Sequence, residues 1–255
     1  VTKSVEEGGL GFDYKWDMGW MNDTLDYFRT APEYRTRDYH KLTFSMMYYY
    51  DERYLLPLSH DEVVHGKATI LQKMYGDYEQ KFPQARAFYM YMYAHPGKKL
   101  NFMGNEIGHF REWDEKRELD WNLLTFPAHQ DFHRFMEDLN HFYLEHPALS
   151  ELDYDAEGFQ WIECHAEEQC VYAFERRSQK ERILAVFNFS DEEQEIEIKC
   201  EDLKTLNRVF SSEYKEYGGQ EEKKEKIIKA KKEIATLKLK PFSAEYYLIQ
   251  PYDKK

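Results

Sequence analysis

The stretch Leu55-Leu-Pro-Leu-Ser-His-Asp-Glu-Val-Val-His-Gly-Lys67 decides how the rest of the chain is interpreted. A short apolar run ends at Ser59, and the next six residues supply two histidines and two adjacent carboxylates. An apolar run of this length is typical of a buried strand, and the polar residues mark the loop that leaves the core. Catalytic side chains gather at the C-terminal ends of parallel strands in α/β proteins, so the candidates are His60, Asp61, Glu62 and His65.

The residues of this loop allow three interpretations. In the first, the loop is structural: Ser59 or Asp61 caps a helical turn, and Glu62 lies at the positive end of the helix dipole. The second, a zinc site, fails because such a helix needs two histidines four residues apart, whereas His60 and His65 are five apart. In the third, a His–Asp pair at a strand end binds a sugar ring. We therefore expect no metal and no cofactor at this loop.

Three further segments settle which family the chain resembles. Together with Leu56–Lys67 they are similar, in the same order, to the 1,4-α-glucan (glycogen) branching enzymes of the α-amylase superfamily. The resemblance covers most of residues 1 to about 150 and is weaker beyond. The segments are Gly8-Gly-Leu-Gly-Phe-Asp-Tyr-Lys-Trp-Asp-Met-Gly-Trp20, Pro96-Gly-Lys-Lys-Leu-Asn-Phe-Met-Gly-Asn-Glu106 and Leu119-Asp-Trp121.

The resemblance implies roles for individual residues. By position in the motif, Asp61 would be the carboxylate that stabilises the transition state, and His60 would bind the same sugar. The nucleophile and the general acid/base of the family lie in motifs resembling Arg-x-Asp-Ala and Ala-Glu-Glu, and this chain contains neither. Nothing beyond their charge supports Glu62 or Glu106 in those roles, so both stay unassigned.

Composition limits the partners. A net charge of -13 and a pI near 5.3 argue against nucleic acid or an anionic membrane surface, whereas a neutral α-glucan needs no basic patch. No apolar run is long enough to span a bilayer. Three cysteines, an odd number, suit a reducing cytoplasm better than a disulfide scaffold. Cys164-His165 with Cys170 is a weak zinc pattern, and strand core residues explain these side chains better.

Periodicity divides the chain into two parts. Helices are expected at about 18–29, from Asp38 onward, from Pro83 to about 94 and at about 130–145, with strands ending near Trp16, Ser59 and Met103. Alternating strands and helices predict a parallel sheet for residues 1–147. Residues 148–255 predict an all-β domain. The expected strands of that domain are 158–164, 169–174, 182–189, 195–199, 236–240 and 245–249, with a solvated charge run at 221–232.

The first part holds only about three strand–helix units, and an eight-stranded barrel needs eight. The resemblance implies the sixth to eighth strands of a (β/α)8 TIM barrel, followed by a C-terminal antiparallel β-sandwich. We therefore expect a fragment of a branching enzyme that is inactive without the N-terminal part of the same enzyme. A non-catalytic glucan-binding protein and another α-amylase-superfamily enzyme are the alternatives.

Overall fold

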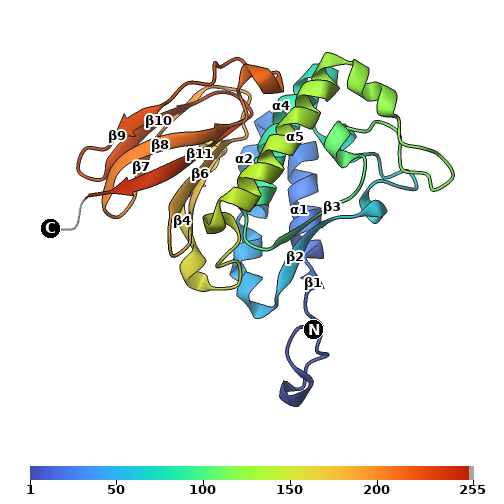
Figure 1. The fold of residues 1–255 in the computed structure, drawn as a ribbon, viewed down its shortest axis with the longest axis horizontal. Helices are drawn as coiled ribbons and strands as arrows, with labels where there is room; N and C mark the ends of the chain where they lie inside the picture. Colours follow the sequence, from blue (N-terminus) through green and yellow to red (C-terminus); the bar gives the residue numbers. More distant parts are fainter. Residues whose placement is uncertain (253–255) are drawn as a thin grey trace.

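Three short strands form a parallel sheet in the first part of the chain (Figure 1). The structure, a computed structural model, describes residues 1–252. Strand β2 (Tyr54–Leu58) lies between β1 (Lys15–Trp16) and β3 (Lys98–Asn101). The three strands run in the same direction, so their C-terminal ends meet at one edge of the sheet.

Helices pack around this sheet. The long ones are α1 (Met18–Arg29), α4 (Tyr78–Ala94) and α5 (Pro127–Glu145), and the short ones are α2 (Arg35–Asp38) and α3 (Ile70–Lys73). Helix α1 has the predicted bounds because the Asp17 carboxylate accepts a hydrogen bond from the Trp20 amide at 2.8 Å, which caps its first turn. The buried side of this helix includes Trp20, Met21, Leu25, Tyr27 and Phe28.

The helix expected from Asp38 onward is wrong. Residues 39–51 form short 3-10 turns instead: η3 (Tyr39–Lys41), η4 (Phe44–Met47) and η5 (Tyr49–Asp51). The Asp38 carboxylate lies 3.5 Å from the Lys41 ammonium group and caps no helix. Leu42 and Tyr49 are buried, whereas Met46, which a helical stripe would place on the same face, is only partly buried.

Two helices begin earlier than expected. Helix α4 starts at Tyr78, where Asp77 and Gln80 form a reciprocal capping box, so Pro83 lies inside the helix and not in its first turn. Helix α5 starts at Pro127, a residue that suits the first helical position because its missing N–H would have no partner there.

The second part of the chain is antiparallel. A six-stranded sheet has the order β4-β5-β6-β11-β8-β9, and β7 pairs with β10 in a separate two-stranded sheet. Strands β8 and β9 are absent from the prediction, and β9 falls within the run expected to be solvated. The bounds are β4 (Phe159–Ala166), β5 (Val171–Arg177), β6 (Arg182–Asn188), β7 (Gln194–Lys199), β8 (Leu203–Ser211), β9 (Ile227–Lys229), β10 (Ile234–Leu239) and β11 (Ser243–Pro251).

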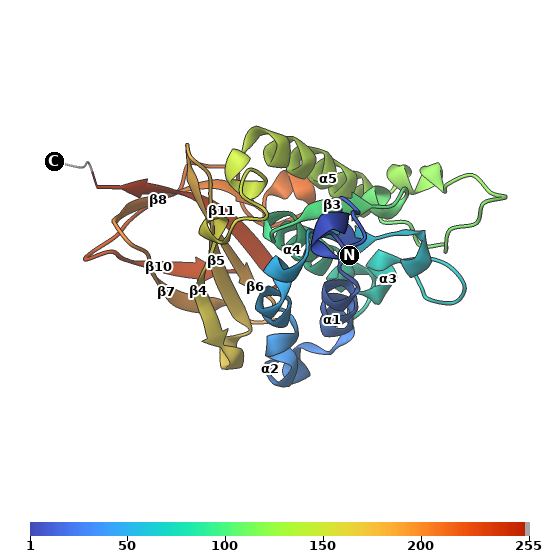
Figure 2. The same cartoon turned by 90° about the horizontal axis from the view of Figure 1, so that it is seen from below.

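Both faces of the six-stranded sheet are buried. Tyr172 and Phe174 of β5 join the apolar cluster that includes α1, α4 and α5, whereas Val171 and Ala173 join a second cluster with β7 and β10. Alternate residues of a strand point to opposite faces, so one strand contributes to both clusters. The view from below shows this sheet against the helical part of the molecule (Figure 2).

Three buried arginines link the two parts. The guanidinium of Arg35 donates to the Phe189 carbonyl at 2.7 Å, that of Arg86 to the Ser212 carbonyl at 2.7 Å, and that of Arg176 to the Ala94 carbonyl at 2.5 Å. Each bond joins residues far apart in sequence, so these side chains fix the β-strands of the second part against the helices of the first.

The outer side of β1 exposes apolar side chains. Phe12, which lies just before β1, is 61% exposed, and Trp16 within β1 is 40% exposed. The neighbouring strand β2 is mostly buried. None of the helices within residues 1–252 combines the length and the apolar character that crossing a membrane requires.

Candidate active site

The end of β2 places the predicted loop at the C-terminal edge of the parallel sheet. The Phe102 amide donates to the Leu58 carbonyl at 2.9 Å, which extends the β2–β3 pairing to the last residue of β2. The Ser59 hydroxyl then accepts a hydrogen bond from the Asp61 amide at 3.2 Å and starts the 3-10 turn η6 (His60–Glu62). The capping expected of Ser59 is therefore present, and it sets the direction of the two side chains that follow.

His60 and Asp61 lie side by side and face solvent. Nε2 of His60 is 3.3 Å from Oδ1 of Asp61, and the two side chains are 50% and 56% exposed. The imidazole of His60 is flanked by aromatic rings, with its centroid 5.9 Å from that of Phe102 and 6.2 Å from that of Trp113. The pair thus offers a carboxylate acceptor and an imidazole on a surface that is partly apolar.

The two unassigned glutamates do not join this pair. Glu62 is buried, in contrast to its exposed neighbour Asp61. The Glu106 carboxylate accepts a hydrogen bond from the Gly104 amide at 2.8 Å, within its own turn after β3. These positions favour structural roles for both.

Sequence reasoning missed three residues that hold the loop. The buried Lys73 ammonium donates to the carbonyls of Glu62 and Ala68, and the Glu112 carboxylate accepts from the amides of Gly66 and Ala68. The Trp113 amide donates to the Val63 carbonyl at 2.9 Å. Glu112 and Trp113 are more than forty residues from the loop that they contact, so no local pattern identifies them.

The electrostatics of these groups follow from their surroundings. Burial lowers the pKa of Lys73 from 10.5 to about 8, and the nearby Arg29 guanidinium adds to the effect. Hydrogen bonds from the Gly66 and Ala68 amides lower the pKa of Glu112, because they stabilise its ionised form.

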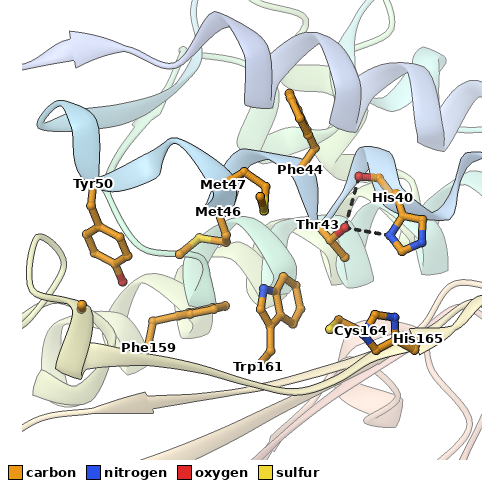
Figure 3. Close-up of a pocket in the computed structure, with 11 residues that line it drawn as sticks. His40, Thr43, Phe44, Met46, Met47, Tyr50, Phe159, Trp161, Cys164 and His165 are labelled. Atoms are coloured by element: carbon orange, nitrogen blue, oxygen red, sulfur yellow. Dashed lines mark hydrogen bonds between the residues drawn. The ribbon is translucent and has the colours of Figure 1, made fainter.

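Two hollows differ in character. One, of about 610 Å³, lies beside the loop between α1 and residues 62–67, and its lining includes Asn22, Arg29 and Lys67. The other, of about 470 Å³, lies away from the strand ends, between the 3-10 turns and β4 (Figure 3). Its walls are mainly apolar and include Met46, Phe159 and Trp161. Neither lining includes His60 or Asp61, but Glu62, the residue after Asp61, lines the first hollow.

No cluster of three or more His, Cys, Asp or Glu side chains suitable for a metal ion occurs within residues 1–252. The three cysteines are unpaired, and Cys170 and Cys200 are buried next to strand ends.

Comparison with known proteins identifies the relatives of the chain. It is 49% identical over 223 residues to the 1,4-α-glucan branching enzyme GlgB 1 of Clostridium perfringens, and the aligned region covers 86% of this chain and 33% of that enzyme. It is 46% identical over 233 residues to the 1,4-α-glucan branching enzyme GlgB of Bacillus cereus, which covers 90% of this chain and 36% of that enzyme. The chain is homologous to these branching enzymes. It spans about a third of their length.

The fold of this branching-enzyme homologue agrees with the match. Residues 161–250 match the family described as "Alpha amylase, C-terminal all-beta domain". The crystal structure of AmyP in complex with maltose superimposes with a TM-score of 0.70 at 14% identity, covering 96% of this chain and 52% of that one. The α-amylase of Geobacillus thermoleovorans complexed with acarbose superimposes with a TM-score of 0.64 at 14% identity, and the match covers 97% of this chain and 50% of that one. The chain therefore has an α-amylase-like fold with an all-β C-terminal domain.

Proposed function

We propose that this chain forms the C-terminal part of a 1,4-α-glucan branching enzyme. Residues 1–147 supply the sixth to eighth strands of a (β/α)8 barrel, and residues 148–255 form a β-sandwich that packs on it. The 49% identity to a branching enzyme supports this assignment, as does the parallel order β1-β2-β3. The apolar side chains exposed along β1 fit an edge that further barrel strands cover.

The reaction follows from the chemistry of a retaining glycosyl transfer. A carboxylate nucleophile attacks the anomeric carbon, and a carboxylic acid protonates the leaving oxygen and then deprotonates the acceptor. In a branching enzyme the acceptor is a 6-hydroxyl of an α-glucan, so an α-1,4 bond breaks and an α-1,6 bond forms. The transition state resembles an oxocarbenium ion.

Asp61 and His60 bind the donor sugar in this scheme. The Asp61 carboxylate accepts hydrogen bonds from the 2- and 3-hydroxyls, and these bonds tighten as positive charge develops on the ring. The His60 imidazole bonds to the same sugar. The observation that carries the proposal is the position of this pair, side by side and solvent-exposed at the C-terminal edge of the parallel sheet.

The remainder of the same enzyme supplies the nucleophile and the acid/base, because the chain spans only a third of its relatives. The chain alone is then inactive, and the whole enzyme acts in the cytoplasm on α-glucan.

Counting new α-1,6 linkages by proton NMR after incubation with amylose tests the proposal. The whole enzyme should form them, and Asp61→Ala should lose most of the turnover while keeping its fold. Asp191→Ala, which removes an exposed carboxylate in the turn between β6 and β7, should keep full turnover. Near-normal turnover in Asp61→Ala would exclude the assignment, and amylose binding without new linkages would indicate a non-catalytic glucan-binding protein.

A further inference from the structure

The loop that carries His60 and Asp61 has an unfavourable backbone. Between η6 and α3, the residues His65, Gly66 and Ala68 have positive φ values of 55°, 80° and 64°. Gly66 adopts this conformation freely, but His65 and Ala68 carry a Cβ that crowds the backbone there. Such residues persist only where the surrounding structure holds them in place.

The Glu112 carboxylate is one group that holds them. Its Oε2 accepts a hydrogen bond from the Gly66 amide at 2.9 Å, and its Oε1 accepts one from the Ala68 amide at 2.8 Å. Amides that converge in a left-handed turn form a concave site for an anion, and here the anion is a side chain of the protein. Because both carboxylate oxygens accept a hydrogen bond from the loop, Glu112 fixes the orientation of residues 66–68 relative to its own carboxylate as well as their distance from it.

Lys73 holds the same loop from the other side. Its ammonium group donates to the Glu62 carbonyl and, at 2.5 Å, to the Ala68 carbonyl. Ala68 is therefore bonded through its amide to Glu112 and through its carbonyl to Lys73. The backbone from residue 62 to residue 68 is fixed at both ends.

The segment that presents Glu112 is itself braced. The neighbouring Arg111 forms an ion pair with Asp120 at 3.1 Å and donates to the Glu118 carbonyl at 2.6 Å. The Asp120 amide donates to Nε2 of His109 at 3.0 Å. These bonds close residues 109–120 into a loop after β3, on the side of the molecule where the loop after β2 also lies (Figures 1 and 2).

The residue after Glu112 reaches the candidate site. Trp113 donates its amide to the Val63 carbonyl and packs its ring against His60 and Phe102, with centroid distances of 6.2 and 5.2 Å. A shift of Glu112 would therefore also move the Trp113 ring, which packs against the His60 imidazole, and the backbone at Val63, two residues after Asp61.

We propose that Glu112 is a positioning residue for the His60–Asp61 pair, acting through the backbone of residues 62–68. This inference rests on the proposed function. Glu112 does not touch the sugar; it sets where the carboxylate and imidazole stand when the sugar binds. Small displacements of such groups lower kcat, because the hydrogen bonds that matter are those of the transition state.

Glu112→Gln tests the contact directly. The amide oxygen can still accept one hydrogen bond, but the amide NH₂ then faces a second N–H donor. In the whole enzyme we expect faster hydrogen exchange at Gly66 and Ala68, and kcat roughly tenfold lower with little change in KM. Glu112→Asp retains both acceptors on a shorter stem and should recover part of the loss. Glu115→Gln makes the same charge change at an exposed position of the same loop and should behave as wild type.

A double-mutant cycle with Asp61→Asn separates positioning from general stability. If Glu112 acts through Asp61, Glu112→Gln should lower kcat little further in the Asp61→Asn background, because the group being positioned has already lost its function. An undiminished tenfold loss in that background would overturn the inference. Unchanged exchange at Gly66 and Ala68 in Glu112→Gln would also overturn it. Neither result bears on the proposed function itself, which is tested separately by whether the whole enzyme forms α-1,6 linkages and whether Asp61→Ala loses that turnover.

Discussion

Replacing the buried Arg176 with methionine should strongly destabilise the protein. Arg176 of β5 is fully buried and donates to the carbonyls of Ala94 and Gly158 and to the Asp153 carboxylate at 2.8 Å. Methionine fills much of the volume but leaves a carboxylate and two carbonyls without these donors. Breaking a buried ion pair by removing one partner costs about 3–5 kcal/mol.

The pKa of Asp153 supports this reasoning. Burial alone would raise it, yet Arg176 and the nearby lysines hold it below its ordinary value of 3.8. The pair therefore stabilises the folded state at neutral pH, and that contribution declines only as the pH falls below about 4.

Urea denaturation at pH 7 measures the effect. Arg37→Met, which removes an exposed arginine 3.7 Å from Asp38, is the control and should change the free energy of unfolding by less than about 1 kcal/mol. Arg176→Met/Asp153→Leu should recover much of the loss, because an apolar pair leaves no unpaired charge. A loss below about 1 kcal/mol in Arg176→Met would refute the view that this contact joins β5 to the end of α4.

Three more predictions concern stability. Burial lowers the pKa of His95 to about 3, so between pH 6.5 and 3 the unfolded chain binds one more proton than the folded protein. The free energy of unfolding should therefore decrease by up to about 1.4 kcal/mol for each unit by which the pH is lowered, and His95→Gln should remove this contribution. Lys73 has a pKa of about 8 in the folded protein, so between pH 8 and 10.5 the unfolded chain binds the extra proton and the free energy of unfolding should increase with pH. Lys73→Met should lack this increase, and an identical pH dependence in the two proteins would contradict the reasoning. Leu184→Ala should cost about 2–5 kcal/mol, since Leu184 is fully buried between the six-stranded sheet and β7 and β10; a loss below about 1 kcal/mol would mean that these sheets pack loosely.

Several features of the fold were readable from the sequence. Helix α1 runs over the predicted residues because its cap, its apolar stripe and Pro32 all agree. The strand ending at Leu58 and the polar loop after it are where the apolar run predicts them. The sequence also carries the signal for the start of α4, since Asp77 and Gln80 have the spacing of a capping box, whereas the prediction from Pro83 alone starts the helix too late.

Other features depend on tertiary contacts. Strand β8 carries polar residues such as Lys204, Asn207 and Arg208 among its apolar ones, so its pattern is weak without the neighbouring strand β11. The short turns of residues 39–51 are 3-10 turns, and over so few residues their apolar spacing does not distinguish three residues per turn from 3.6. The role of Glu112 comes from one loop meeting another that is more than forty residues away, so no local window of sequence contains both partners. Lys73 is close in sequence to Glu62 and Ala68, but its bonds go to backbone carbonyls, which no side-chain pattern reveals.

A donor that lacks the 3-hydroxyl on the sugar next to the scissile bond tests the central claim most directly. If the Asp61 carboxylate accepts a hydrogen bond from that hydroxyl, the whole enzyme should transfer the deoxygenated donor roughly tenfold or more slowly than the natural one. Asp61→Asn should show little discrimination between the two donors. Equal discrimination by wild type and Asp61→Asn would contradict the account, because some other residue would then hold the hydroxyl.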